Sequence, residues 1–282
     1  MLVFKGFKDL NKHLNHVRNQ DPNLIIGLVP TMGALHQGHL SLVRQCNKDC
    51  DLTICSIFIN PTQFDKQNDL TNYPKPIAQD ISLLIQAQCD VLLLPDVQEV
   101  YPESYVHQTF DIKNIDNIIE GKSRVGHFQG VCNVIYRFFS EITPQKAYFG
   151  QKDFQQTVVI KKLVALVGLR VDIVVCPIVR ENNGLAMSSR NIRLSRGGKQ
   201  EAKCIYEALC ILKKHYKKLG ISNSIGLAKK HILATKGTEI DYLVVVNTSN
   251  LAITKEQNRN EMIALVVVNF EGIRLLDNLI LS

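Results

Sequence analysis

The chain has 282 residues, of which 45% are hydrophobic and 21% charged, the balance of a globular protein with room for one large or two modest domains. The formal net charge is +7. Lysine pairs such as Lys213–Lys214 alternate with apolar residues at helical spacing, which is typical of solvated helix faces. No aromatic cluster accompanies them, so we expect no nucleic-acid partner. No apolar run approaches the roughly 18 residues of a spanning helix, and the first residues lack an apolar core of signal-peptide length, so we expect a cytoplasmic protein with no membrane partner.

Eight cysteines are spread along the chain, and none belongs to a CxxC pair. They occupy positions 46, 50, 55, 89, 132, 176, 204 and 210. They are scattered through apolar segments, so we interpret them as small buried thiols rather than as a disulfide framework. Cys46 and Cys50 share a helical i, i+4 spacing, but no further Cys or His cluster completes a zinc set. We therefore predict no metal site built on cysteine.

The N-terminal part of the chain alternates short apolar runs with helical patterns. Residues 24–29 form a continuous apolar run, which is typical of a buried parallel strand. A turn rich in glycine follows over residues 30–39, and Leu40 and Val43 then recur at helical spacing. The same pattern continues as far as residue 176. We expect further strands over residues 51–60, 89–95, 146–149 and 171–176, and helices over residues 79–88, 131–140 and 157–167.

Strands separated by helices predict βαβ units, and so an α/β fold with a Rossmann-like, doubly wound parallel sheet. Open parallel sheets bind ligands outside the carboxyl ends of their strands. The turns at residues 30–39, 60–64 and 150–153 would all lie at that edge. We therefore look for the functional site in these three turns.

After Pro177 the pattern changes. Residues 180–196 are polar and loop-like, and two helical patterns and then apolar strands follow. We expect helices over residues 199–218 and 224–234, strands over residues 242–247 and 262–270, and a terminal segment over residues 274–281. The prediction is a Rossmann-like domain over residues 1–177 and a smaller α+β domain over residues 178–282.

The turn at residues 30–39 contains the pattern His-x-Gly-His, formed by His36, Gly38 and His39. Two imidazoles beside a helix N-terminus are able to donate to phosphate oxygens and to stabilise charge on a departing pyrophosphate. Gly38 lets the backbone approach a nucleotide closely. A pair of surface histidines in a turn remains the alternative. No GxxxxGK sequence occurs, so a Walker-type nucleotide site is excluded.

Two further clusters supply donors for phosphate. Ser188 and Ser189 are followed by Arg190, which combines two hydroxyls with a planar cation. Gly150 ends a predicted strand and is followed by Lys152, a point charge suited to a phosphate. Taken alone, each cluster is equally compatible with an ordinary surface turn.

Together and in this order, the motifs resemble the pantoate–β-alanine ligase (pantothenate synthetase) family of the nucleotidyltransferase superfamily. The resemblance covers nearly the whole chain and is weakest over residues 11–21 and 219–238. His-x-Gly-His alone is shared across the superfamily, whereas the other segments are more specific. The segments that carry the resemblance are "PTMGALHQGHLSLV" (30–43), "SIFINPTQF" (56–64), "GHFQGV" (126–131), "KAYFGQKDFQQ" (146–156) and "GLAMSSRN" (184–191).

The resemblance implies a set of site residues. His39, His36 and Lys152 would act in catalysis, with His39 at the position usually assigned as proton donor. Gln63 and Gln156 match the pantoate-binding glutamines of the family, and Asn60 lies beside them in the substrate site. The residues expected to bind ATP are Met32, Gly33, Ala34, Leu35, His36, Gln37, Gly38, His39, Gly150, Gln151, Lys152, Asp153, Val179, Met187, Ser188, Ser189 and Arg190.

The resemblance also implies a reaction: pantoate, β-alanine and ATP would give pantothenate, AMP and pyrophosphate through an enzyme-bound pantoyl adenylate. Magnesium would be bound through the ATP phosphates rather than by a protein site, and the enzyme would be a homodimer. Two alternatives remain. One is another adenylyl- or cytidylyltransferase that stops at the nucleotidyl product, and the other is a non-catalytic nucleotide-binding regulator.

Three segments depart from the usual family pattern. Lys75 and Pro76 stand where arginine and threonine are common, and Val125 replaces a proline. Asn182 and Asn183 replace a pair that is usually more acidic or contains proline. These changes affect the expected loop conformations and remove none of the donors assigned above.

Overall fold

The structure, a computed structural model, describes residues 1–65, 67–254 and 261–281. It divides into two compact units, each described here by itself. Unit 1 consists of Met1–Gly150 and Gln155–Cys176, and unit 2 consists of Gln151–Phe154 and Pro177–Ser282. No helix within the described ranges combines the length and the apolar character that crossing a membrane requires.

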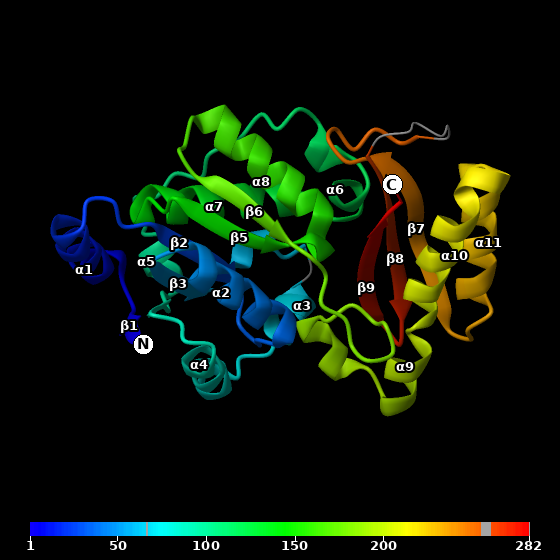
Figure 1. Cartoon of the computed structure of the whole chain (residues 1–282), viewed down its shortest axis with the longest axis horizontal. Helices are drawn as coiled ribbons and strands as arrows, with labels where there is room; N and C mark the ends of the chain where they lie inside the picture. The colour runs from blue at the N-terminus through cyan, green and yellow to red at the C-terminus, as the bar shows by residue number, and fades with distance from the viewer. Residues whose placement is uncertain (66, 255–260, 282) are drawn as a thin grey trace. The chain divides into compact units, whose positions relative to one another are not determined.

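Unit 1 is built on a six-stranded parallel sheet (Figure 1). The strands follow the order β1-β4-β3-β2-β5-β6. From β2, the chain adds β3 and β4 on one side of the sheet and then β5 and β6 on the other. The predicted doubly wound α/β fold is therefore confirmed. The bounds are β1 (Leu2–Phe4), β2 (Ile26–Thr31), β3 (Leu52–Ile57), β4 (Val91–Leu93), β5 (Lys146–Gly150) and β6 (Asp172–Cys176).

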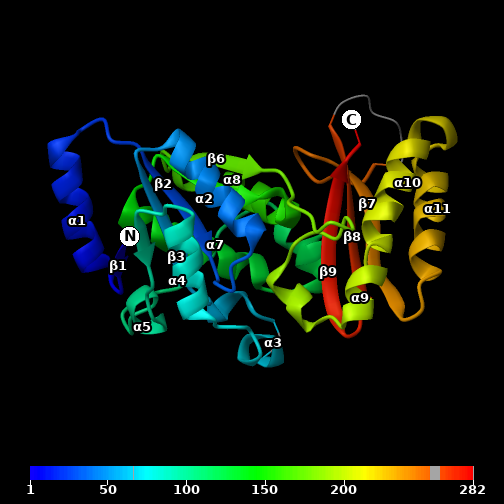
Figure 2. The ribbon, with the colours of Figure 1, turned by 60° about the horizontal axis from the view of Figure 1, so that its bottom comes forward.

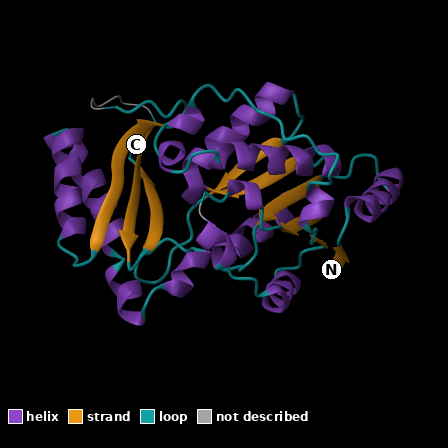
Figure 3. Ribbon diagram, turned by 180° about the vertical axis from the view of Figure 1, so that it is seen from behind, coloured by secondary structure: helices purple, strands orange, loops and turns teal. Residues whose placement is uncertain are grey.

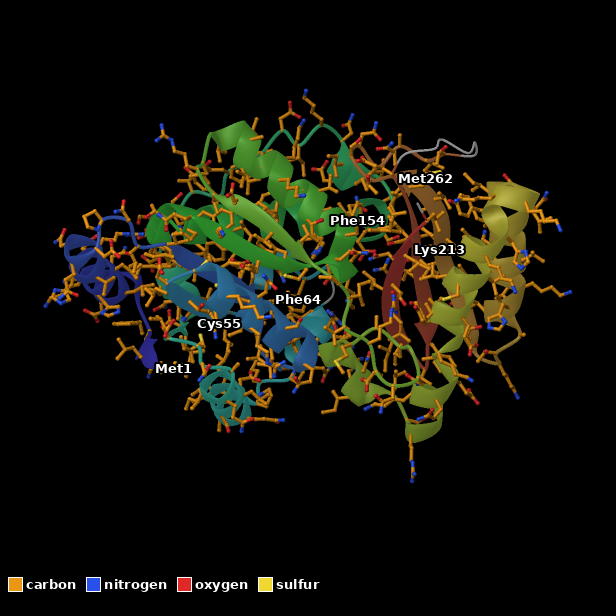
Figure 4. The ribbon with its side chains drawn as sticks, in the orientation of Figure 1. Met1, Cys55, Phe64, Phe154, Lys213 and Met262 are labelled. Atoms are coloured by element: carbon orange, nitrogen blue, oxygen red, sulfur yellow. The ribbon has the colours of Figure 1, made fainter. Side chains whose placement is uncertain are left out.

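Helices cover both faces of this sheet, and the two-residue period of the strands divides the core between them. In β5, Ala147 and Phe149 join the core cluster with residues of α1, α7 and α8, whereas Tyr148 joins the cluster with α2 and α4. Cys55, labelled in Figure 4, is a fully buried member of the second cluster. The main helices are α1 (Phe7–Gln20), α2 (Gln37–Asp49), α4 (Ile77–Gln86), α7 (His127–Ile142) and α8 (Phe154–Val167).

Along the chain, these strands and helices are joined by short helical segments, one of which, α5, buries Val100 in the core. They are η1 (Pro61–Gln63), α3 (Gln67–Thr71), α5 (Val97–Val100), η2 (Ile115–Asn117), α6 (Glu120–Ser123) and η3 (Gln151–Asp153).

Unit 2 contains an antiparallel sheet of three strands in the order β7-β8-β9. Helices α10 (Cys204–Leu219) and α11 (Ile221–Leu233) lie side by side against it, as Figures 1 and 2 show. Figure 3 shows the two helices on one side of these strands. The strands are β7 (Thr238–Asn247), β8 (Met262–Phe270) and β9 (Ile273–Ile280). The predicted α+β character of the C-terminal part is confirmed.

Two of the differences between the structure and the expected elements have a local cause. The N-terminal β1 and α1 were not predicted, because α1 is mostly polar and buries only Phe7, Leu10 and Leu14. The helix expected over residues 199–218 is two helices, α9 (Arg196–Glu201) and α10. The break lies at Ala202, whose carbonyl accepts from the Ile205 N–H three residues later, which tightens the turn between the helices.

Candidate active site

The His-x-Gly-His turn begins where β2 ends and runs into the N-terminus of α2. Gly33 has φ +81°, which favours glycine, and Ala34 follows at φ +49°. This left-handed pair is held from behind by Asp80 of α4. Its carboxylate accepts from the N–H of Ala34 at 2.9 Å and from the N–H of Leu35 at 2.7 Å. Burial raises the pKa of the Asp80 carboxyl, and the two N–H donors stabilise its charged form.

The two histidines of this turn lie together. Their ring centroids are 4.1 Å apart, with an angle of 36° between the planes. His36 is the N-cap of α2, and its Nδ1 accepts from the Gly38 N–H at 3.1 Å. Since Nδ1 accepts, the proton of the neutral ring sits on Nε2, which becomes a donor. The arrangement therefore offers a ring N–H beside the positive end of a helix, a suitable place for phosphate oxygens.

Gln63, Asn60 and Met32 are also brought together in unit 1. The Gln63 amide nitrogen contacts the Met32 sulfur, and the Gln63 Oε1 accepts from Asn60 Nδ2 at 3.3 Å. Asn60 is only 1% exposed. Its Nδ2 also donates to the Gly130 carbonyl, while its Oδ1 accepts from the Tyr101 hydroxyl at 3.0 Å. Asn60 thus orients the Gln63 amide and is itself oriented by Tyr101.

The backbone at Gln63 is fixed as well. Its carbonyl lies 2.7 Å from His127 Nδ1 and accepts from Arg124 Nη2 at 3.1 Å. Gly130 allows α7 to approach this segment, because a Cβ there would collide with the carbonyl of Thr62. Arg124 and His127 flank Val125, which is 85% exposed. The substitution at Val125 therefore leaves the contacts on both sides of it in place.

The adjacent glutamines of α8 have different surroundings. Gln155 is 5% exposed. Its Nε2 donates to the carbonyls of Ile115 and Ile118, and its Oε1 accepts from the Glu120 N–H. It therefore holds the segment from η2 to α6. Gln156 is half-buried. Gln155 therefore serves the fold by holding these backbone groups, whereas Gln156 is the one of the two that we expect to bind substrate.

In unit 2, the segment Gln151–Asp153 is a single 3₁₀ turn. Lys152 Nζ lies 3.2 Å from Asp153 Oδ1, and the Asp153 side chain is half exposed. The carbonyls of Gln151 and Lys152 both accept from Asn278 Nδ2, each at 2.9 Å. Asn278, which sequence analysis did not select, therefore fixes the backbone that carries Lys152.

The segment with the Ser-Ser-Arg sequence is organised by its own backbone. The Met187 N–H donates to the Val179 carbonyl at 3.0 Å, so these two predicted residues are neighbours. Ser188 is the N-cap of η4 (Ser189–Arg193) and accepts from the Arg190 N–H at 3.2 Å. The buried Asn191 donates to the Ala186 carbonyl. Ser188, Ser189 and Arg190 thus sit on a rigid turn.

Arg180 and Asp277 form a buried ion pair in unit 2. Arg180 Nη1 and Nη2 donate to the two Asp277 oxygens at 2.6 and 2.9 Å. The guanidinium stacks 3.8 Å from the ring centroid of Tyr206. Burial raises the pKa of the Asp277 carboxyl, and Arg180 opposes that rise. The pair extends the rigid turn, because Arg180 also donates to the Gly184 carbonyl.

The cysteine thiols are mostly buried, as predicted, whereas Cys50 is partly buried and Cys210 is exposed. Burial raises the pKa of the Cys89 thiol to about 11 and that of the Cys132 thiol to about 12. Neither is an activated nucleophile. Within the described ranges, no three His, Cys, Asp or Glu side chains gather as a metal site would require.

Comparison with known proteins gives a consistent result. A family model described as pantoate-beta-alanine ligase matches residues 2–280. A pantothenate synthetase of Caldicellulosiruptor bescii is 44% identical over 285 residues, covering 100% of this chain and 99% of that protein. One from Cytophaga hutchinsonii is 41% identical over 284 residues, covering 100% and 99%.

Solved structures agree with these sequence matches. Pantothenate synthetase from Thermus thermophilus superposes with a TM-score of 0.94 at 34% identity, and the match covers 100% of both chains. Pantoate-beta-alanine ligase from Francisella tularensis, solved with β-γ ATP and β-alanine, superposes with a TM-score of 0.82 at 32% identity over 99% of this chain and 97% of that one. With a family model that spans residues 2–280, the chain belongs to the pantoate–β-alanine ligase family.

Proposed function

We propose that this protein condenses pantoate with β-alanine, using ATP and releasing AMP and pyrophosphate. The observation that carries the proposal is the His36–His39 pair, which lies at the N-terminus of α2 in a chain that matches the ligase family from end to end. An imidazole pair at a helix N-terminus suits the charge that grows on a triphosphate as pyrophosphate leaves.

In the first step, the pantoate carboxylate attacks the α-phosphate of ATP and forms pantoyl adenylate. His36 donates from Nε2 to a phosphate oxygen, since its Nδ1 is occupied by the Gly38 N–H. His39 stabilises the departing pyrophosphate, and Lys152 adds a positive charge. Positioning and electrostatics supply the acceleration, and no protein nucleophile takes part.

The remaining predicted residues complete the nucleotide site in this proposal. The turn from Met32 to His39 lines the triphosphate, and Gly150 to Asp153 contact the adenosine. Val179 and Met187 to Arg190 add further contacts, with Arg190 as a phosphate cation. As the family resemblance implies, residues 178–282 serve as a lid.

Pantoate is recognised by the side chains of Gln63 and Gln156, each of which offers a donor and an acceptor to its hydroxyl and carboxylate groups. Asn60 is a positioning residue in this account, since its amide is committed to Gln63, Gly130 and Tyr101. In the second step, the amine of β-alanine attacks the acyl carbon and AMP leaves with the bridging oxygen.

Magnesium enters this proposal on the ATP phosphates. Mg²⁺ keeps several waters and commonly binds through substrate phosphates and one or two carboxylates. Asp80, the carboxylate behind the turn, is used by two backbone N–H groups, so this proposal leaves the ion on the phosphates. The bound ion would favour pyrophosphate as leaving group. The resemblance further supports a cytoplasmic homodimer.

An oxygen-labelling experiment tests this chemistry. Pantoate labelled with ¹⁸O in its carboxylate should deliver label to AMP and none to pyrophosphate, because the attacking oxygen bridges carbon and phosphorus in the intermediate. Without β-alanine, the enzyme should still exchange labelled pyrophosphate into ATP. Unlabelled AMP would exclude the acyl adenylate, and ADP with labelled phosphate would indicate phosphoryl transfer.

The same assay separates the alternatives. A nucleotidyltransferase that stops at the adenylate would release no AMP in response to β-alanine. A non-catalytic regulator would bind ATP and show neither exchange nor AMP. Free AMP that depends on both pantoate and β-alanine is the result we expect.

A further inference from the structure

The polar dipeptide Asp277-Asn278 lies within strand β9 of unit 2, at positions where the strand is buried. Strand β9 buries Ile273 and Leu275 in the core with α10 and α11, and Asp277 follows at the same two-residue spacing. Asp277 is 5% exposed and Asn278 is 1% exposed. Burying a carboxylate and an amide is unfavourable unless every polar atom finds a partner. Both side chains therefore require hydrogen-bond partners inside unit 2.

Successive side chains of a strand point to opposite faces, so the two residues serve different segments. On the helix-covered face, Asp277 accepts from both Arg180 nitrogens, and its Oδ1 also accepts from the Asn278 N–H at 2.7 Å. Arg180 lies beside Val179, and it pairs as an isolated antiparallel bridge with Ala186. Asp277 thus holds the start of the turn that carries Ser188–Arg190.

On the other face, Asn278 holds the turn that carries Lys152. Its Nδ2 donates to the carbonyls of Gln151 and Lys152, and its Oδ1 accepts from Gln151 Nε2 at 3.0 Å. Both N–H groups of the Asn278 side-chain amide thus donate to this segment. A three-residue 3₁₀ turn has little intrinsic stability, so these bonds determine where the Lys152 backbone lies.

We propose that Asn278 and Asp277 are positioning residues that join the Lys152 turn and the Val179–Arg190 turn into one rigid phosphate-binding frame. The inference rests on the proposed function, in which Lys152 and Arg190 act on ATP. It assigns to β9 the task of setting the spacing between two cationic groups. Neither Asn278 nor Asp277 contacts the nucleotide.

A double-mutant cycle tests the link between Asn278 and Lys152. In Asn278→Ala, kcat/KM for ATP should fall by about 10- to 10²-fold, the effect expected when a catalytic group is misplaced by about 1 Å. KM for pantoate should stay within about twofold, because its glutamines belong to unit 1. The double variant Asn278→Ala/Lys152→Ala should be no slower than Lys152→Ala alone, since residues that act as a unit are not additive.

Additive losses in the cycle would overturn the proposal, because they would show that Asn278 acts independently of Lys152. Asn269→Ala, a half-buried asparagine of the neighbouring strand that pairs with Arg274, is the control and should change kcat/KM less than about twofold, because it holds neither turn. Wild-type enzyme without AMP formation would contradict the proposed function instead, so the two failures are distinguishable.

If Asn278→Ala does not unfold cooperatively in urea, Asn278→Ser is the second variant. It keeps a small polar side chain and loses the amide that donates to the carbonyls of Gln151 and Lys152. Asn278→Ser should lower kcat/KM for ATP by several-fold and should add nothing to Lys152→Ala. An unchanged kcat/KM, or a fully additive loss, would contradict the proposal.

Discussion

His36 combines two tasks in one side chain. As the N-cap of α2 it accepts from the Gly38 N–H, and in the proposed mechanism its other nitrogen donates to phosphate. A cap usually belongs to Ser, Thr, Asp or Asn, since their short side chains reach the open N–H groups. In the proposed mechanism, the side chain that caps α2 is therefore also the one that donates to the phosphate.

The two tasks of His36 are separable by substitution. His36→Asn retains a good capping group and loses the imidazole, so its free energy of unfolding should stay close to that of the wild type. His36→Ala loses both and should unfold about 0.5–2 kcal/mol more easily. Both variants should lose turnover by roughly 10²–10³. Urea unfolding and pyrophosphate exchange measure the two effects. Wild-type turnover in His36→Asn would remove the imidazole from the mechanism.

The adjacent glutamines of α8 should respond to substitution in opposite ways. Gln155→Ala removes the acceptor of the buried Glu120 N–H and a donor to the Ile115 and Ile118 carbonyls, so it should destabilise unit 1 by about 1–3 kcal/mol. Gln156→Ala should leave stability unchanged and weaken discrimination between pantoate and a deoxy analogue. Adenylation rates with both acids decide the second point. Equal discrimination in Gln156→Ala and the wild type would show that Gln156 does not recognise the hydroxyl.

At the scale of elements, α4 supports the His-x-Gly-His turn through one side chain. Asp80 lies on the same helix face as Ile77 and Leu84, and it is fully buried. Its two oxygens each accept one backbone N–H of the turn at Ala34 and Leu35. The left-handed backbone of Gly33 and Ala34 is unfavourable by itself, so α4 contributes the contacts that maintain it.

Asp80→Asn should disturb this turn, because an amide has one oxygen and must present its NH₂ to one of the two N–H donors. The loss should destabilise the protein by about 1–3 kcal/mol, raise KM for ATP and leave KM for pantoate nearly unchanged. Steady-state kinetics and urea unfolding measure these effects. Gln79→Ala, an exposed neighbour on α4, is the matched control. An unchanged KM for ATP in Asp80→Asn would separate α4 from the nucleotide site.

At the scale of the whole molecule, paired carboxylates of unit 2 make stability depend on pH. Ser195 donates to Glu271 from its hydroxyl at 2.6 Å and from its N–H at 2.8 Å, and these bonds lower the pKa of Glu271 from its usual 4.5. Because the pKa is lower in the folded state, the stabilisation is present above pH 4.5 and is lost as pH falls through the folded value.

Glu271→Gln should therefore be less stable than the wild type at pH 7 and should lose less stability as pH falls below 4.5. Urea unfolding at several pH values measures the difference between the two proteins, which isolates Glu271 from the other carboxylates. Glu103→Gln, at an exposed position of unit 1, controls for the removal of a charge. Parallel pH profiles for Glu271→Gln and the wild type would contradict the assignment.

The sequence by itself predicted what depends on local pattern. Continuous apolar runs separated by helical periodicity led to the parallel sheet, and β8 was predicted with the bounds 262–270 that the structure has. The motif residues were found because their spacing along the chain is short. Local pattern failed where an element is polar, as in α1, and where a turn tightens inside a helical run, as at Ala202.

Tertiary structure alone decided which residues support the site. The hydrogen-bond partners of Asp80, Tyr101 and Asn278 are 45, 41 and 127 residues away along the chain. Periodicity in the sequence does not predict contacts between residues so far apart. In the sequence, Asp80 and Asn278 are marked only by being polar at positions where α4 and β9 bury a side chain. Burial of such a group needs partners, and only the packed fold determines which backbone groups those partners are.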